Sequence, residues 1–187
     1  MTQSLAALIR AGHPLVGIET TDEPAAVQCV EDAALALGRP LLRWSVTEGL
    51  IGMPEGRGKR VAGPLADPGK PHAALRKLRE RDDAFVALLL DAGPHASDPV
   101  VHRLFRDLAA KFAETGGCAV VCDSTPPADV LRPFLLRFDL PRPTPERLRE
   151  VVKETVRDAR RDARRGKAAG RPGKAVEAKV SESQFTR

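Results

Sequence analysis

The fold is decided by "AFVALLLDAG", residues 84–93, the most continuous apolar run in the chain. The run shows no alternation of polar and apolar side chains, so a strand built from it must be covered on both faces. Central strands of parallel sheets have this character. It ends in Asp91 and Gly93, and glycine marks a turn. We therefore expect a buried parallel strand that ends in a corner at the edge of a sheet.

Apolar runs and helical patterns alternate on both sides of this segment. The helix expected over 98–114 has its buried stripe at Val101, Leu104, Phe105, Leu108 and Phe112. Four more strands are expected, at 14–20, 41–46, 118–125 and within 128–140. Residues 49–71 are rich in Gly and Pro without a period, and are expected to form a long loop. The alternation predicts an α/β fold, a three-layer, doubly wound, mostly parallel five-stranded sheet.

The corner after the first expected strand, "GIETTDEPAAVQ" at 17–28, is acidic. A phosphate loop has glycines and a lysine at such a corner. Here Glu19, Asp22 and Glu23 would repel phosphate at a helix N-terminus whose dipole would otherwise attract it. Thr21 or Asp22 instead suits the helix cap. The other Gly/Lys segment, "GRGKR" at 56–60, follows no strand and lacks the spacer of a phosphate loop.

Few other residues suggest chemistry. "ALLLDAG" has the form of a Walker B strand with Asp91 at the magnesium position, but Ala92 stands where a second acid would polarise water. His95 follows Asp91 closely, yet no serine or cysteine elbow completes a triad. The cysteines at 29, 118 and 122 are expected to be buried free thiols, because C-x3-C alone is a poor zinc pattern. No catalytic residue, metal site or cofactor is assigned.

The net charge of +5 has one source, "RDARRDARRGKAAGRPGK" at 157–174, with eight Arg or Lys against two Asp. This segment predicts a basic helix end and a flexible linker, or alternatively a nucleic-acid-binding tail with steep salt dependence. No run approaches the ~18 apolar residues of a membrane span, and no signal-peptide pattern opens the chain. We expect a cytoplasmic protein with no membrane partner.

Two further segments carry a family resemblance: "RWSVTEGL" at 43–50, and "RFDLPRPTPERLREVV" at 137–152, which is similar to the turn into the helical lid of AAA proteins. With the alternation over about 4–156, the chain resembles the N-terminal degenerate AAA-like domain of AAA-type ATPases related to the plastid and cyanobacterial hypothetical-reading-frame family. The resemblance implies a P-loop NTPase fold without its phosphate loop. It implies a degenerate Walker B position at Asp91 and places Arg132 or Arg137 near an arginine finger.

The resemblance also implies an organisation and a function. Residues 1–156 would be the AAA-like domain, and 157–187 a linker that leads to a lid or ATPase domain outside this chain. ATP and magnesium would belong to that second domain. We expect a non-catalytic interaction or regulatory module that binds a protein partner or AAA ring neighbours. The alternatives are a receiver-like phosphoacceptor domain using Asp91, and nucleic-acid binding through 157–174.

Overall fold

The computed structural model describes residues 4–53, 67, 69–141, 149, 152–153 and 156–157. The chain divides into two units, residues 1–141 and 142–187, and the α/β domain is the first. Most of residues 142–156 and nearly all of the basic segment 157–174 lie outside the described residues, so the domain boundary expected at 156 stays a prediction. Within the described part of the chain, no helix is long and apolar enough to cross a membrane.

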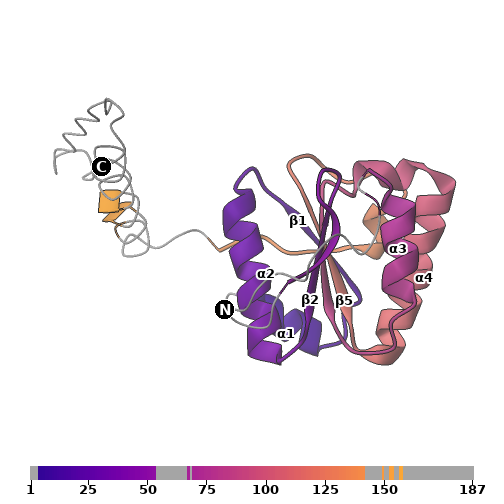
Figure 1. Ribbon diagram of the computed structural model, residues 1–187, viewed down its shortest axis with the longest axis horizontal. Helices are drawn as coiled ribbons and strands as arrows, with labels where there is room; N and C mark the ends of the chain where they lie inside the picture. The colour runs from indigo at the N-terminus through magenta and orange to yellow at the C-terminus, as the bar shows by residue number, and fades with distance from the viewer. Residues whose placement is uncertain are drawn as a thin grey trace, which may run out of the picture. The chain divides into compact units, whose positions relative to one another are not determined.

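One mixed sheet organises the first unit, with strand order β3-β2-β4-β5-β1-β6 (Figure 1). All pairs are parallel except β2 with β3. The strands are β1 (Leu15–Glu19), β2 (Leu41–Ser45), β3 (Gly49–Met53), β4 (Val86–Leu90), β5 (Cys118–Asp123) and β6 (Leu136–Arg137). Every residue of β4 is buried, which confirms that the apolar run is a central strand.

Helices cover both faces of this sheet, so the predicted three-layer α/β class is confirmed (Figure 1). Helices α1 and α2 pack on one face, and α3 and α4 pack on the other. The α-helices are α1 (Leu5–Arg10), α2 (Glu23–Leu37), α3 (Pro71–Arg79) and α4 (Pro99–Thr115), and the short 3-10 helices are η1 (Pro94–Ser97) and η2 (Arg132–Phe134). The five apolar residues expected on one side of α4 are its buried residues.

Side-chain caps fix where the longer helices begin. The Asp22 carboxylate accepts a hydrogen bond from the Ala25 N–H at 3.1 Å, at the start of α2. Asp98 accepts from the N–H groups of Val100 and Val101 at the start of α4. Such bonds satisfy donors that the first helical turn leaves free. The acids that open both helices are therefore structural, as expected for Asp22.

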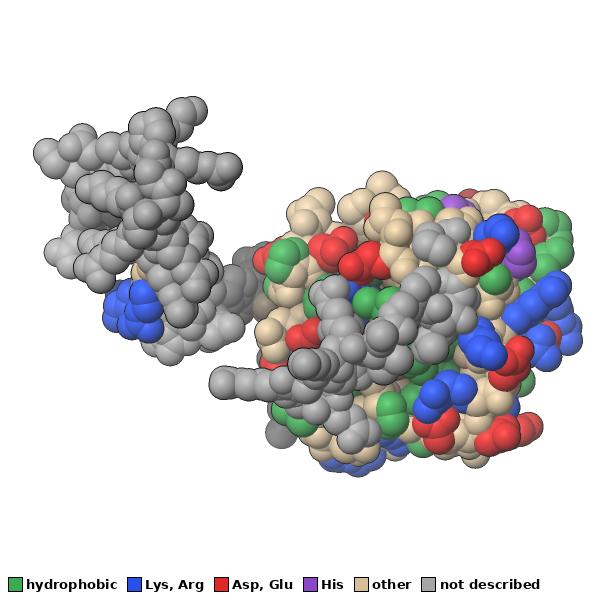
Figure 2. Space-filling view, in the orientation of Figure 1, with side chains coloured by type: hydrophobic (Ala, Val, Ile, Leu, Met, Phe, Trp, Pro, Cys, Tyr) green, Lys and Arg blue, Asp and Glu red, His purple; other side chains and the backbone are tan. Residues whose placement is uncertain are grey.

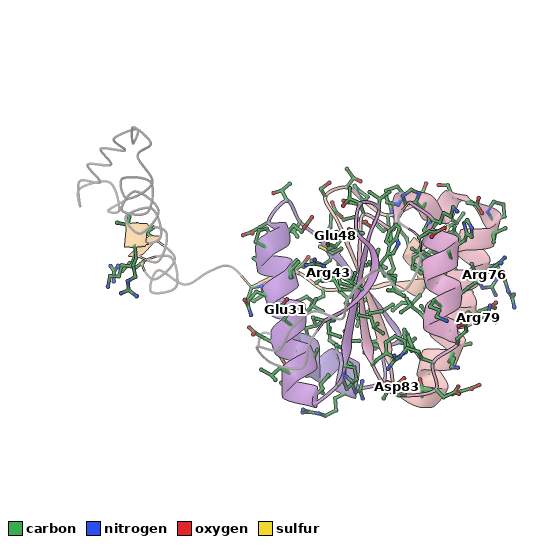
Figure 3. All side chains as sticks on the ribbon, in the orientation of Figure 1. Glu31, Arg43, Glu48, Arg76, Arg79 and Asp83 are labelled. Atoms are coloured by element: carbon green, nitrogen blue, oxygen red, sulfur yellow. The ribbon has the colours of Figure 1, made fainter. Side chains whose placement is uncertain are left out.

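The expected loop over 49–71 is wrong at its beginning, because residues 49–53 form β3. This strand pairs antiparallel with β2, and the sheet has six described strands rather than five. The turn between them is held by an Arg43–Glu48 ion pair of 2.6 Å (Figure 3). The Glu48 N–H also donates to Ser45 Oγ at 3.1 Å. "GLIGM" lacks a polar/apolar alternation, so only its pairing with β2 reveals it.

The strand order contradicts the receiver-like alternative. In the flavodoxin-like order 2-1-3-4-5, the first strand lies between the second and third parallel strands. Here β1 lies between β5 and β6, and β5 separates it from β4. The acids that follow β1 and the aspartate that follows β4 are thus not on adjacent strands, as a receiver-like phosphoacceptor site would need. Local sequence patterns carry no information on this order, because it depends on which strands pair.

Candidate functional site

Acidic side chains meet at the carboxyl edge of the sheet, where open α/β sheets bind ligands. Glu19 ends β1 and Asp123 ends β5, and the two are Cα partners in the parallel ladder. Asp91 follows β4, and its N–H donates to the Cys122 carbonyl at 3.0 Å. Figure 2 shows acidic side chains along the upper edge of the domain, near the start of α2. The structure thus brings the acidic corner after β1, Asp91 and Asp123 to the same edge of the sheet.

Asp123 is the buried member of this group, with only 3% of its surface exposed. Its Oδ1 accepts a hydrogen bond from the Gly93 N–H at 3.2 Å. Burial raises the pKa of Asp123 to about 6; the Gly93 hydrogen bond opposes this shift, and the charge of Asp91 adds to it. The strand expected over 118–125 contains Asp123, but this residue was not among the candidate site residues. The signal was a buried run that ends in an acid.

The backbone around Gly93 fits closely against that carboxylate. A Cβ on Gly93 would lie 2.1 Å from Asp123 Oδ2 and 2.9 Å from Pro127 Cβ. Only glycine leaves room for this approach. The turn after β4 and the segment after β5 are therefore locked together through Asp123.

Asp91, the expected Walker B position, is exposed and has a left-handed backbone with φ of 55°. Non-glycine residues seldom adopt this conformation, although Asp tolerates it better than most. The next residue, Ala92, is 2% exposed and belongs to the core under α3 and α4. The position where a second acid would stand is therefore part of the core.

Backbone N–H groups at the corner between β1 and α2 are hydrogen-bonded to neighbouring residues of the domain. Besides the Asp22 cap, Thr20 Oγ1 accepts from the Asp22 N–H at 3.0 Å, and the Thr20 N–H donates to the Asp123 carbonyl at 2.9 Å. Glu23 adds a carboxylate in the first turn of α2. Neither Glu19 nor Glu23 lies within ion-pair distance of a described Lys or Arg, although the charge of Glu19 helps to raise the pKa of Arg137.

A cavity of about 500 Å³ opens beside Glu19 and Asp123. Both arginines suggested by the family resemblance line it, and each already faces an acid. Arg132 lies 3.2 Å from Asp129, and Arg137 lies 2.9 Å from Asp139. The lining residues are Gly17, Ile18, Glu19, Val121, Asp123, Pro126, Pro127, Arg132, Leu135 and Arg137.

The remaining candidates of the sequence lie elsewhere. The His95 ring packs edge-on against Trp44 with 6.1 Å between centroids. Burial raises the pKa of the Cys118 and Cys122 thiols to about 12, so these free cysteines stay protonated near neutral pH. Among the residues described by the structure, no group of three or more His, Cys, Asp or Glu side chains could hold a metal ion.

Comparison with known proteins agrees with this architecture. No curated protein matches the chain. Residues 1–135, more than half of the chain, match the family model described as the N-terminal domain of SpoVK-like AAA ATPases. The narrower relationship to plastid and cyanobacterial proteins stays a prediction. The chain therefore belongs to the family of SpoVK-like AAA ATPase N-terminal domains.

Proposed function

We propose that this domain is a non-catalytic interaction module of an AAA ATPase, and that it binds another protein chain rather than a nucleotide. The observation that carries the proposal is the charge at the carboxyl edge. Glu19, Asp91 and Asp123 stand at the ends of neighbouring strands, at the edge where a nucleoside triphosphate would lie. A triphosphate placed there would meet like charge from all three acids, and the repulsion would be strongest near Asp123, the buried one.

The N-terminus of α2 supports the same conclusion. Helix N-termini attract phosphate because free N–H groups and the helix dipole favour negative charge. In this domain the Asp22 carboxylate already bonds the Ala25 N–H, and Glu23 stands beside it. The protein's own carboxylates therefore fill the place that a phosphate would take. ATP binding and hydrolysis would then belong to a separate ATPase domain, as the family resemblance implies.

Calorimetric titration of the full chain with ATP and Mg²⁺ tests this proposal. We expect no saturable heat up to millimolar nucleotide, and stoichiometric binding would overturn it. Light scattering on the same sample measures the mass. A monomer would indicate a partner of different sequence, whereas a defined oligomer would indicate contacts between neighbouring copies in a ring.

A further inference from the structure

The cavity lies over β1 and β5 and is bounded by the connection that leads to β6. This connection, residues 124–135, contains only the three-residue helix η2. Its last residue, Leu135, faces Gly17, and a Cβ built on Gly17 would lie 3.4 Å from Leu135 Cδ1. Because Gly17 has no side chain, Leu135 can lie close to the backbone of β1 at this point. The volume of about 500 Å³ is within the ~300–1,000 Å³ range of ligand pockets.

The walls combine an apolar surface with a pair of acids. Val121, Pro127 and Leu135 supply apolar contact area. Glu19 and Asp123 are in register on adjacent strands, so their side chains leave the same face of the sheet about 5 Å apart at the backbone. Two carboxylates at this spacing can share one guanidinium or ammonium group.

The cavity is lined by two acids and two arginines, and the buried charge among them is that of Asp123. Asp123 is almost fully buried, and its Oδ2 accepts no hydrogen bond from any described residue. No described Lys or Arg lies within ion-pair distance of Glu19, although the charge of Glu19 helps to raise the pKa of Arg137. Arg132 and Arg137 are engaged by Asp129 and Asp139. An anion at the arginines would compete with Asp129 and Asp139 and would lie beside two carboxylates, whereas a cation at Asp123 Oδ2 meets an acceptor that no described residue uses.

We propose that this cavity receives an arginine or lysine side chain of a partner protein. The cationic head would bind the carboxylates of Asp123 and Glu19, and its aliphatic stem would lie on Val121, Pro127 and Leu135. The inference rests on the proposed function, because it names the chemistry of the partner of the same module.

The test uses nuclear magnetic resonance on the full chain, with N-acetyl-arginine amide as the probe. N-acetyl-citrulline amide is the matched control, since it has the same shape without the charge. The arginine probe should shift the amide signals of Gly17 and Gly93 with a saturable dependence. The citrulline probe should leave them in place.

Variants locate the binding site. Asp123→Asn keeps an acceptor for the Gly93 N–H but loses the charge, and should weaken binding of the arginine probe by about tenfold, as loss of a charge-assisted hydrogen bond does. Glu19→Gln should act in the same direction. Asp82→Asn is the control, because Asp82 is exposed and pairs with Lys111 on another part of the surface. It should bind like the parent chain.

Three results would overturn the inference: equal shifts with both probes, no shifts at Gly17 and Gly93, or unchanged affinity in folded Asp123→Asn. Thermal unfolding verifies that each variant is folded. The nucleotide titration separates this inference from the proposed function. Failure of the arginine probe without ATP binding rejects only the cationic partner, whereas ATP binding rejects the non-catalytic module itself.

Discussion

Replacing Asp123 with Asn should stabilise the domain at neutral pH. The pKa of Asp123 is raised from 3.8 to about 6, chiefly by burial. Each pKa unit corresponds to ~1.36 kcal/mol, so holding this carboxylate ionised in the folded state costs about 3 kcal/mol. Asn carries no charge and keeps an oxygen that can accept the hydrogen bond from Gly93. Up to this amount should be recovered in the variant.

The extra stability of Asp123→Asn over the parent chain should increase as the pH rises. Between about pH 4 and pH 6 the folded chain holds a proton on Asp123 that the unfolded chain has released. The stability of the parent chain therefore falls as the pH rises through this window. The stability of Asp123→Asn should not fall in this window, because Asn does not ionise. The two chains should therefore be about equally stable at pH 4. The variant should be more stable above pH 7.

Urea unfolding at pH 4 and pH 7.5 measures the free energy of unfolding of the parent chain and of Asp123→Asn at each pH. Asp82→Asn is again the matched control, because its side chain is 92% exposed and no gain is expected there. If Asp123→Asn were no more stable than the parent chain at pH 7.5, the ionised Asp123 carboxylate would not destabilise the fold as expected. An equal gain at both pH values would also refute this expectation, because the effect would then not come from the charge.

Three further predictions concern local packing, a helix cap and the basic segment. Gly93→Ala should lower the free energy of unfolding by roughly 1–3 kcal/mol in urea titrations, because the added Cβ would collide with Asp123 and Pro127. A variant as stable as the parent chain would contradict the close fit around Gly93. Asp98→Ala should lower the free energy of unfolding in urea by about 1 kcal/mol, because two capping hydrogen bonds are lost. An unchanged urea midpoint would argue against the cap. If 157–174 binds nucleic acid, fluorescence anisotropy with single-stranded DNA should show affinity that falls steeply with salt and vanishes on deletion of 157–187. Binding that survives the deletion would place the contact elsewhere.

Sequence patterns predicted the elements whose burial is set locally. The run at 84–93 is a central strand because it is apolar throughout, and the stripe on α4 follows helical periodicity to the residue. Asp22 caps α2 because a short acidic side chain before a proline suits that position. Such features depend on neighbours in the chain.

The features that were missed depend on contacts between distant segments. Strand β3 has two glycines in five residues and is stabilised by pairing with β2 and by the Arg43–Glu48 ion pair. The burial of Asp123 follows from the approach of Gly93, thirty residues away. The cavity exists because the β5–β6 connection passes over Gly17, and no local pattern predicts this path.

The most direct test of the non-catalytic role is ATP binding by the full chain and by Asp91→Asn, measured by calorimetry with Mg²⁺ present. We expect no saturable binding to either chain, because carboxylates occupy the edge where phosphates would lie. Binding to the parent chain that is lost in Asp91→Asn would contradict the non-catalytic role. Asp91 would then hold a nucleotide-bound magnesium ion, and the domain would be a working nucleotide site.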